Sequence, residues 1–261
     1  MAPSRLFYVD DILLFGRANK CTITFIKSIF SHYEEVSGQV INFSKSSVMF
    51  GKGISISKQI IVSRQHGVQK GDLPFTYLGV PLFWGRIKRG YLENISLKIM
   101  NQLSNWKGKN LSQAGRICLV NSVITSMFVY SFSIYCWPRS LINEFSCKIR
   151  NFVWTGSIHE RKMVTVAWKD CISPIQMGGM GVNDIRLFND TLIDKLTWNL
   201  ITFSDSSMDF LQLRFINKFH KGHSIYLCSS IWPAIRRAYS ELMTSSKWIV
   251  SKNSALNFWT N

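Results

Sequence analysis

ICLVNSVITSMFVYSFSIYCWP, residues 117 to 138, contains no charged side chain and decides which class of fold this chain can adopt. Its length would just span a lipid bilayer. However, it carries Asn121, Thr125 and four serines, and its apolar residues recur on one face of a helix. This pattern favours a helix packed inside a globular domain, and a membrane span is the less favoured alternative. The residues of that face are Ile117, Val120, Ile124, Met127 and Ile134.

Helical patterns flank this stretch on both sides, between residues 85 and 156. An earlier helix is indicated by apolar residues at a spacing of three to four, and the uncharged helix itself begins near Ser112. We expect a third helix to be capped by Ser140 and to end at Gly156. Residues 85 to 156 therefore predict a compact helical bundle. The apolar faces of the outer helices are Leu92, Ile95, Ile99, Leu103 and Trp106, and Leu141, Phe145, Ile149 and Phe152.

The chain after the bundle is predicted to be mainly helical. MVTVAW, residues 163 to 168, is typical of a short strand, and QMGGMGV, residues 176 to 182, of a glycine-rich linker. A helix is predicted from Asp184 to Phe203, and a final hairpin turns near Asn253. The predicted apolar face of that helix repeats every four residues, at Phe188, Leu192, Leu196 and Leu200.

The chain before the bundle is predicted to contain short strands. LFYVDDILLF, residues 6 to 15, indicates strand, turn and strand, and a helix follows from Asn19 to Ser37, closed by Gly38. VINFSKSSVMFG, residues 40 to 51, indicates two more short strands, and YLGVPLF, residues 77 to 83, an edge strand or a tight bend. The whole chain therefore predicts an α+β fold with short antiparallel hairpins, a helical bundle and a mainly helical C-terminal region.

Charge indicates the class of partner. The formal net charge is +16, and residues 73 to 169 contain thirteen Lys or Arg against three Glu and no Asp. Such a surplus is typical of proteins that bind a polyanion, and a nucleic-acid backbone is the partner we expect. The alternative is a solvated basic face without a specific partner.

The six cysteines are scattered without a C-x-x-C pair, and no histidine stands at zinc-finger spacing. We therefore expect no zinc site and reduced thiols in an intracellular protein of the nucleus or cytoplasm. The N-terminus lacks the pattern of a secretory signal peptide, so secretion is not predicted.

Asp10 and Asp11 are adjacent acids at the tip of the first predicted hairpin. Aspartates are favoured in turns, which is one interpretation. The other is a divalent metal site, since Mg²⁺ binds carboxylate oxygens and phosphoryl-transfer enzymes use such ions. The residues alone leave both interpretations open.

Several motifs carry a resemblance to a known family. Tyr8-Val9-Asp10-Asp11 resembles the Y/F-x-D-D motif of reverse transcriptases. SGQVINFSKSSVMF, residues 37 to 50, resembles the next motif of their palm, with Asn42 and Lys45 matching an Asn-x-x-Lys pattern. YLGVPL, residues 77 to 82, resembles the primer-grip segment.

The later motifs resemble the same family in the same order. LSNWKGKNLSQAGRICLVNSVI (103 to 124) and FVWTG (152 to 156) resemble the thumb of plant LINE-type elements, and WKDCISPIQMGGMGVNDI (168 to 185) resembles the segment that follows it. Together the motifs resemble the RNA-directed DNA polymerase of plant LINE-type non-LTR retrotransposons over nearly the whole chain.

The resemblance implies nucleotidyl transfer on an RNA or DNA template-primer with Mg²⁺. It implies that Asp10 and Asp11 are catalytic metal ligands and that Lys45 donates a proton to pyrophosphate. Three residues would lie against the primer end, namely Tyr77, Leu78 and Gly79. Six would contact the nucleic-acid backbone, namely Arg86, Lys88, Arg89, Lys107, Lys109 and Arg116. The implied segments are a partial palm over 1–84, a thumb-like domain over 85–160 and a post-thumb region over 161–261.

Departures from the family pattern limit the implied activity. Only five residues precede the LFYVDD segment, so we expect the finger strands and a further catalytic aspartate to be absent. The expectation is a truncated fragment that is inactive alone. The alternatives are a non-catalytic basic protein that binds RNA or DNA, and a retroelement relic without function. The sequence does not indicate an oligomeric state.

Overall fold

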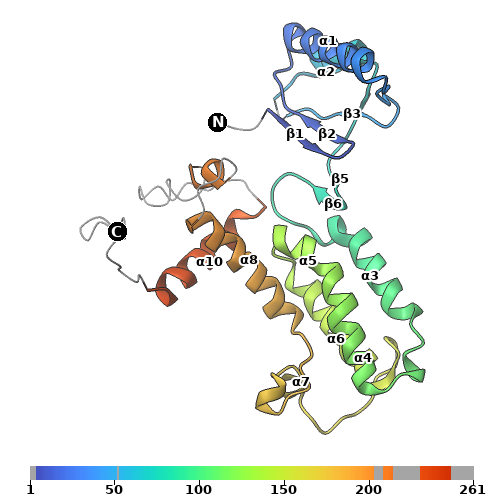
Figure 1. Ribbon diagram of the computed structural model, residues 1–261, viewed down its shortest axis with the longest axis vertical. Coiled ribbons are helices and arrows are strands. Elements are labelled where there is room, and N and C mark those ends of the chain that lie inside the picture. The colour runs from blue at the N-terminus through green and yellow to red at the C-terminus, as the bar shows by residue number, and fades with distance from the viewer. Residues whose placement is uncertain (1–3, 52, 203–207, 214–229, 248–261) are drawn as a thin grey trace. The chain divides into compact units, whose positions relative to one another are not determined.

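The structure is a computed structural model that describes residues 4–51, 53–202, 208–213 and 230–247 (Figure 1). The chain divides into two compact units, Met1–Tyr77 and Leu78–Asn261. The α+β class is confirmed, because two-stranded sheets occur together with a C-terminal part that is mainly helical. The three segments implied by the family resemblance stay a prediction. The hairpin expected near Asn253 lies outside the described residues.

The first unit begins with the expected hairpin. Strand β1 (Arg5–Tyr8) pairs antiparallel with β2 (Asp11–Leu14), and Tyr8 lies opposite Asp11. Helix α1 (Lys20–Ser37) follows as predicted. The Asn19 side chain accepts a hydrogen bond from the Thr22 N–H, and Gly38 ends the helix at a φ of 69°. Both helix ends are therefore set by local residues.

The prediction of two strands within residues 40–51 is wrong. Only β3 (Ser47–Val48) is a strand there, and it pairs in parallel with the distant β4 (Gln69–Lys70). The Asn42 side chain accepts a hydrogen bond from the backbone N–H of Lys45 and holds the residues before β3 in a turn. Helix α2 (Ile56–His66) was not predicted, and the side chain of its N-cap residue makes no capping hydrogen bond.

The first unit buries few apolar side chains. Ile23, Val62 and Val68 are its buried hydrophobic residues among those described, whereas sixteen of its large apolar side chains are exposed. Both faces of the β1–β2 hairpin are open, since nearly all of its residues are exposed. The hydrophobic core of the described chain is therefore concentrated in the second unit.

The second unit begins at a tight bend. Leu78 and Gly79 both have positive φ, 50° and 81°, and stand between β5 (Phe75–Tyr77) and β6 (Val80–Leu82). The Tyr135 hydroxyl donates to the Pro81 carbonyl at 2.9 Å, which fixes β6 against the helical bundle. Burial raises the pKa of this hydroxyl, which favours its neutral, donating form.

The uncharged stretch forms the central helix of the bundle. Helix α4 (Gln113–Leu119), the π-helical turn η3 (Val120–Ile124) and α5 (Thr125–Ile134) follow one another without a break. The run begins after Ser112, as predicted, and the Ser112 side chain caps it by accepting from the Gly115 N–H. The run is long and apolar enough to cross a membrane by length and composition, and one third of its most apolar window is buried in the protein. Its buried face carries Val120, Ile124, Phe128 and Phe132.

Two helices flank the central one (Figure 1). The turn η1 (Arg89–Leu92) leads into α3 (Glu93–Asn105), and η2 (Gly108–Asn110) connects α3 to α4. Helix α6 (Arg139–Thr155) ends at Gly156 as predicted. The predicted cap at Ser140 is wrong, because α6 begins at Arg139 after Pro138, whose fixed φ suits a helix start. Aromatic rings fill the core between these helices: Phe128, Phe132, Trp137, Phe145 and Phe152.

The predicted strand at residues 163–168 is also wrong. Residues 161–167 are exposed and irregular, and α7 (Trp168–Cys171) follows. The glycine-rich loop is confirmed, with the short turn η4 (Ile175–Met177) inside it. The Asn121 side chain holds this loop, since it donates to the Gly181 carbonyl at 2.8 Å and accepts from the Asn183 N–H at 3.0 Å. A polar residue of the uncharged helix thus attaches the loop to the bundle.

Helix α8 (Ile185–Thr202) is confirmed, but its predicted buried face is displaced. The fully buried positions include Ile193 and two polar residues, Asn189 and Thr197. The Asn189 amide donates to the carbonyls of Phe132 and Tyr135 and accepts from the Trp137 N–H, at 2.9 to 3.2 Å. Its side chain therefore pairs carbonyls at the C-terminal end of α5, which a helix leaves without intrahelical partners.

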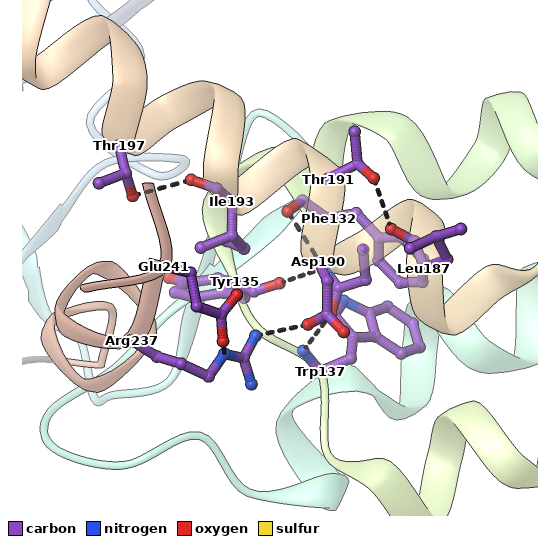
Figure 2. Close-up of polar contacts among 11 residues, drawn as sticks. Phe132, Tyr135, Trp137, Leu187, Asp190, Thr191, Ile193, Thr197, Arg237 and Glu241 are labelled. Atoms are coloured by element: carbon purple, nitrogen blue, oxygen red, sulfur yellow. Dashed lines mark hydrogen bonds and ion pairs between the residues drawn. The ribbon is translucent and has the colours of Figure 1, made fainter. Parts of the chain in front are cut away.

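Helix α10 (Trp232–Ser245), which was not predicted, packs against α8. Figure 2 shows Arg237 of α10 between Asp190 and Glu241, with its guanidinium 2.5 Å from the Asp190 carboxylate. Burial, followed by the charges of Glu241 and Asp190, raises the pKa of the nearby Asp194 carboxyl. Acidic groups thus crowd around a single arginine at this helix contact.

We predict that Asn189→Leu lowers the free energy of unfolding by about 2–4 kcal/mol, because it strands a buried N–H and two buried carbonyls. Urea unfolding measures the change. Asn199→Leu is the matched control on the same helix, where the side chain is half-buried. Equal losses in the two variants would contradict the capping role of Asn189.

Candidate nucleic-acid interface

The two aspartates of the first motif lie at the exposed tip of the β1–β2 hairpin. Asp10 is in the turn, Asp11 begins β2, and both carboxylates are exposed. Val9 has a φ of 52°, so the turn places a non-glycine residue in the left-handed region. Within the described part of the chain, no three His, Cys, Asp or Glu side chains come together in a way that could hold a metal ion. The Mg²⁺ site at Asp10 and Asp11 stays a prediction.

The other predicted contact residues of the first motifs are also near turns. Lys45 is exposed in the turn shaped by Asn42. Tyr77 and Leu78 are half-buried, and Gly79 is exposed at the bend before β6. Their roles at a primer end stay predictions.

The six predicted backbone-binding cations fall into two groups. Arg86, Lys88 and Arg89 lie in the segment before α3, where Arg89 is 2.6 Å from the Glu144 carboxylate of α6. The Lys88 ammonium lies 5.9 Å from the centre of the Tyr91 ring. The other three, Lys107, Lys109 and Arg116, are brought together at the turn that connects α3 to α4.

A close approach of two glycines builds this second group. Gly108 of η2 and Gly156 at the end of α6 are so near that a Cβ on Gly108 would lie 2.5 Å from the Gly156 carbonyl oxygen. A Cβ on Gly156 would lie 2.5 Å from the backbone nitrogen of Lys109, and Gly156 also has a positive φ of 77°. Only residues without a side chain allow this contact.

Arg116 fixes the contact of the two glycines. Its guanidinium donates to the Gly108 carbonyl at 2.8 Å and to the Val153 carbonyl at 3.2 Å, which joins the η2 turn to the last turn of α6. The Arg116 side chain is half-buried. Its hydrogen-bonding capacity is thus partly used within the protein, while Lys107 and Lys109 remain exposed.

A pocket opens beside this contact. Its volume is about 360 Å³, and its walls come from residues 103, 104, 106–110 and 156–160. Lys107 and Lys109 stand on one side, and the Lys109 ammonium is 2.5 Å from the Glu160 carboxylate on the other. We call this the junction pocket. Sequence reasoning missed its second wall: Ser157, His159 and Glu160 belong to no recognisable motif, and only FVWTG just before them was noticed.

Charge over the whole basic segment, residues 73–169, follows the predicted pattern. Ten of its thirteen Lys and Arg side chains are exposed. Two of the three Glu side chains, Glu144 and Glu160, are already paired with Arg89 and Lys109. The other eight exposed cations have no acidic partner within the described residues: Arg86, Lys88, Lys98, Lys107, Arg139, Arg161, Lys162 and Lys169.

Comparison with known proteins finds relatives in a plant. A protein of Arabidopsis thaliana named "Putative ribonuclease H protein At1g65750" is 29% identical over 191 residues, which is 70% of this chain and 30% of the relative. An uncharacterized mitochondrial protein of the same plant is 31% identical over 74 residues, which is 28% of this chain and 48% of the relative. The chain spans less than half the length of both curated relatives. No known family description matches it.

These relatives correct the family assignment made from the motifs. The resemblance was to a reverse transcriptase, whereas the relative that matches most of this chain is named for ribonuclease H, and neither relative is named a reverse transcriptase. The assignment to that family is therefore wrong. The name of the relative that matches most of this chain is that of a nuclease, an enzyme that acts on nucleic acid.

We predict that Gly108→Ala destabilises the second unit by about 1–3 kcal/mol, because the new methyl group overlaps the Gly156 backbone. Gly90→Ala is the matched control, since a Cβ there meets open space and the φ is not positive. Thermal unfolding of both variants measures the difference. Equal stability of the two would show that the glycine contact is not as close as described.

Proposed function

We propose that this chain binds nucleic acid through the exposed cations of the basic segment. The observation that supports this proposal most is the group of eight exposed cations without an acidic partner within the described residues. Phosphate groups of a nucleic acid are the common polyanion for which lysine and arginine provide charge-assisted hydrogen bonds.

The arrangement of the acids supports a polyanion as the partner. In a segment with thirteen cations, Glu144 and Glu160 each pair with a cation from a different turn, η1 or η2. These pairs are exposed, so each contributes little to stability in water. They leave the field of the segment strongly positive, and that field attracts a polyanion from a distance.

The similarity to a protein named for ribonuclease H agrees with this proposal in its partner class. The chain spans 30% of that relative, so the only property that we extend from the relative to this chain is an affinity for nucleic acid. Contacts to phosphate position a strand without reading its sequence, and we therefore expect binding with little sequence preference.

We predict that a fluorescent single-stranded RNA binds the purified chain with an affinity that falls steeply with salt. The logarithm of the association constant should fall linearly with the logarithm of the salt concentration, with a slope of about 0.7 for each phosphate neutralised. Fluorescence anisotropy across a salt series measures this slope. An affinity that does not change between low and moderate salt would contradict the proposal.

A pair of double variants locates the surface. Arg86→Ala with Lys88→Ala should reduce the salt slope by roughly 0.7–1.4, because one or two phosphate contacts are lost. Lys20→Ala with Lys27→Ala removes the same charge from the exposed surface of α1 in the first unit. A larger loss in this control than in the test pair would place the binding surface outside the basic segment.

A further inference from the structure

The junction pocket differs from the rest of the basic segment because it combines cations with an aromatic ring and a concave shape. Its volume of about 360 Å³ lies within the range of about 300–1,000 Å³ that is usual for small-molecule sites. The walls include Lys107, Lys109, Trp106, Asn110 and Ser157. Charged, aromatic and hydrogen-bonding groups therefore face one space.

We propose that the junction pocket holds one nucleotide of a single-stranded nucleic acid, with its phosphate at Lys107 and Lys109 and its base against Trp106. This inference rests on the proposed function, since it names a single binding position within the basic segment. It adds a defined ligand unit, a nucleoside monophosphate, to a surface otherwise expected to bind only through charge.

The two lysines explain the phosphate position. Lys107 is exposed and has no acidic partner within the described residues. Lys109 is held by Glu160, but both side chains are more than half exposed, at 64% and 53%. An exposed ion pair is weak in water, so a phosphate can replace the Glu160 carboxylate. Glu160 then acts as a competitor that lowers the affinity of the pocket.

Trp106 explains the base position. One contact of its ring is with Phe152 in the core, at 5.7 Å between ring centres, while the side chain is only half-buried and also lines the pocket. Bases of single strands stack readily on such aromatic side chains, regardless of sequence. Asn110 and Ser157 supply donors and acceptors for the edge of the base. A duplex fits less well, because its bases are already stacked on each other.

The test follows the indole N–H signal of Trp106 by NMR, assigned through its loss in Trp106→Phe. Adenosine monophosphate should shift this signal at concentrations where adenosine alone or inorganic phosphate alone does not. Lys107→Ala should weaken the binding of adenosine monophosphate at least threefold, and Glu160→Gln should strengthen it by a similar factor. Both Trp106 variants lack the indole signal, so their affinities are measured by isothermal titration calorimetry. Trp106→Phe should retain binding, whereas Trp106→Ala should lose at least fivefold in affinity, which is the lower end expected for stacking.

A matched control is Lys195→Ala on the exposed surface of α8, which should leave the affinity unchanged. The inference is overturned if adenosine monophosphate does not shift the Trp106 signal, or if inorganic phosphate alone shifts it equally well. It is also overturned if Lys107→Ala and Glu160→Gln have no effect. Salt-dependent RNA binding that persists in those cases keeps the proposed function, whereas loss of both refutes the two together.

Discussion

The close contact of the Gly108 and Gly156 backbones is the constraint on which the candidate interface depends. No side chain fits between the η2 turn and the end of α6, and the guanidinium of Arg116 ties the two together by donating to Gly108 and Val153. This contact holds the backbone on either side of Gly108, which carries Lys107 and Lys109, next to residues 156–160. The interface is thus built by packing of the main chain and is not simply an accumulation of surface charge.

Side-chain amides hold two other parts of the second unit by hydrogen bonds to the main chain. Asn121 holds the glycine-rich loop, and Asn189 pairs with the backbone at the end of α5. Asn189 replaces water at backbone groups that the fold takes out of solvent, and leaving such groups unpaired costs about 1–3 kcal/mol each. The described part of the first unit has far fewer buried side chains, with most of its apolar residues exposed. The stability of the chain is therefore expected to come mainly from the second unit.

Local signals in the sequence predicted the elements whose ends depend on local residues. Helix α1 is delimited by the Asn19 cap and by Gly38, and α4 begins at the Ser112 cap, all of which are visible in the sequence. Hydrophobic spacing identified the buried Leu200 of α8 but displaced the rest of its buried face, because that face contains Asn189 and Thr197, whose polarity hides their burial from a pattern search. The strand predicted for residues 163–168 failed because apolar side chains alone do not supply a partner strand.

Only one of the two segments that form the candidate site was predicted from the sequence, because the contact that joins them is not local. Lys107, Lys109 and Arg116 were identified from the sequence, but Arg116 donates to main-chain carbonyls of the protein itself. The wall formed by Ser157, His159 and Glu160 was missed, since its proximity to Lys107 arises from a contact between two distant glycines. The family resemblance predicted a reverse transcriptase, which the names of the relatives do not support. The charge pattern predicted a polyanionic partner, and most cations of the basic segment are exposed in the structure.

Hydrogen–deuterium exchange of the whole chain with and without single-stranded RNA tests the central claim most directly. If the glycine contact positions the interface, RNA should slow exchange in residues 103–110 and 156–160 together, while α10 on the other side of α8 keeps its exchange rate. Protection of only one of these two segments, or protection confined to the first unit, would contradict an interface built at their junction.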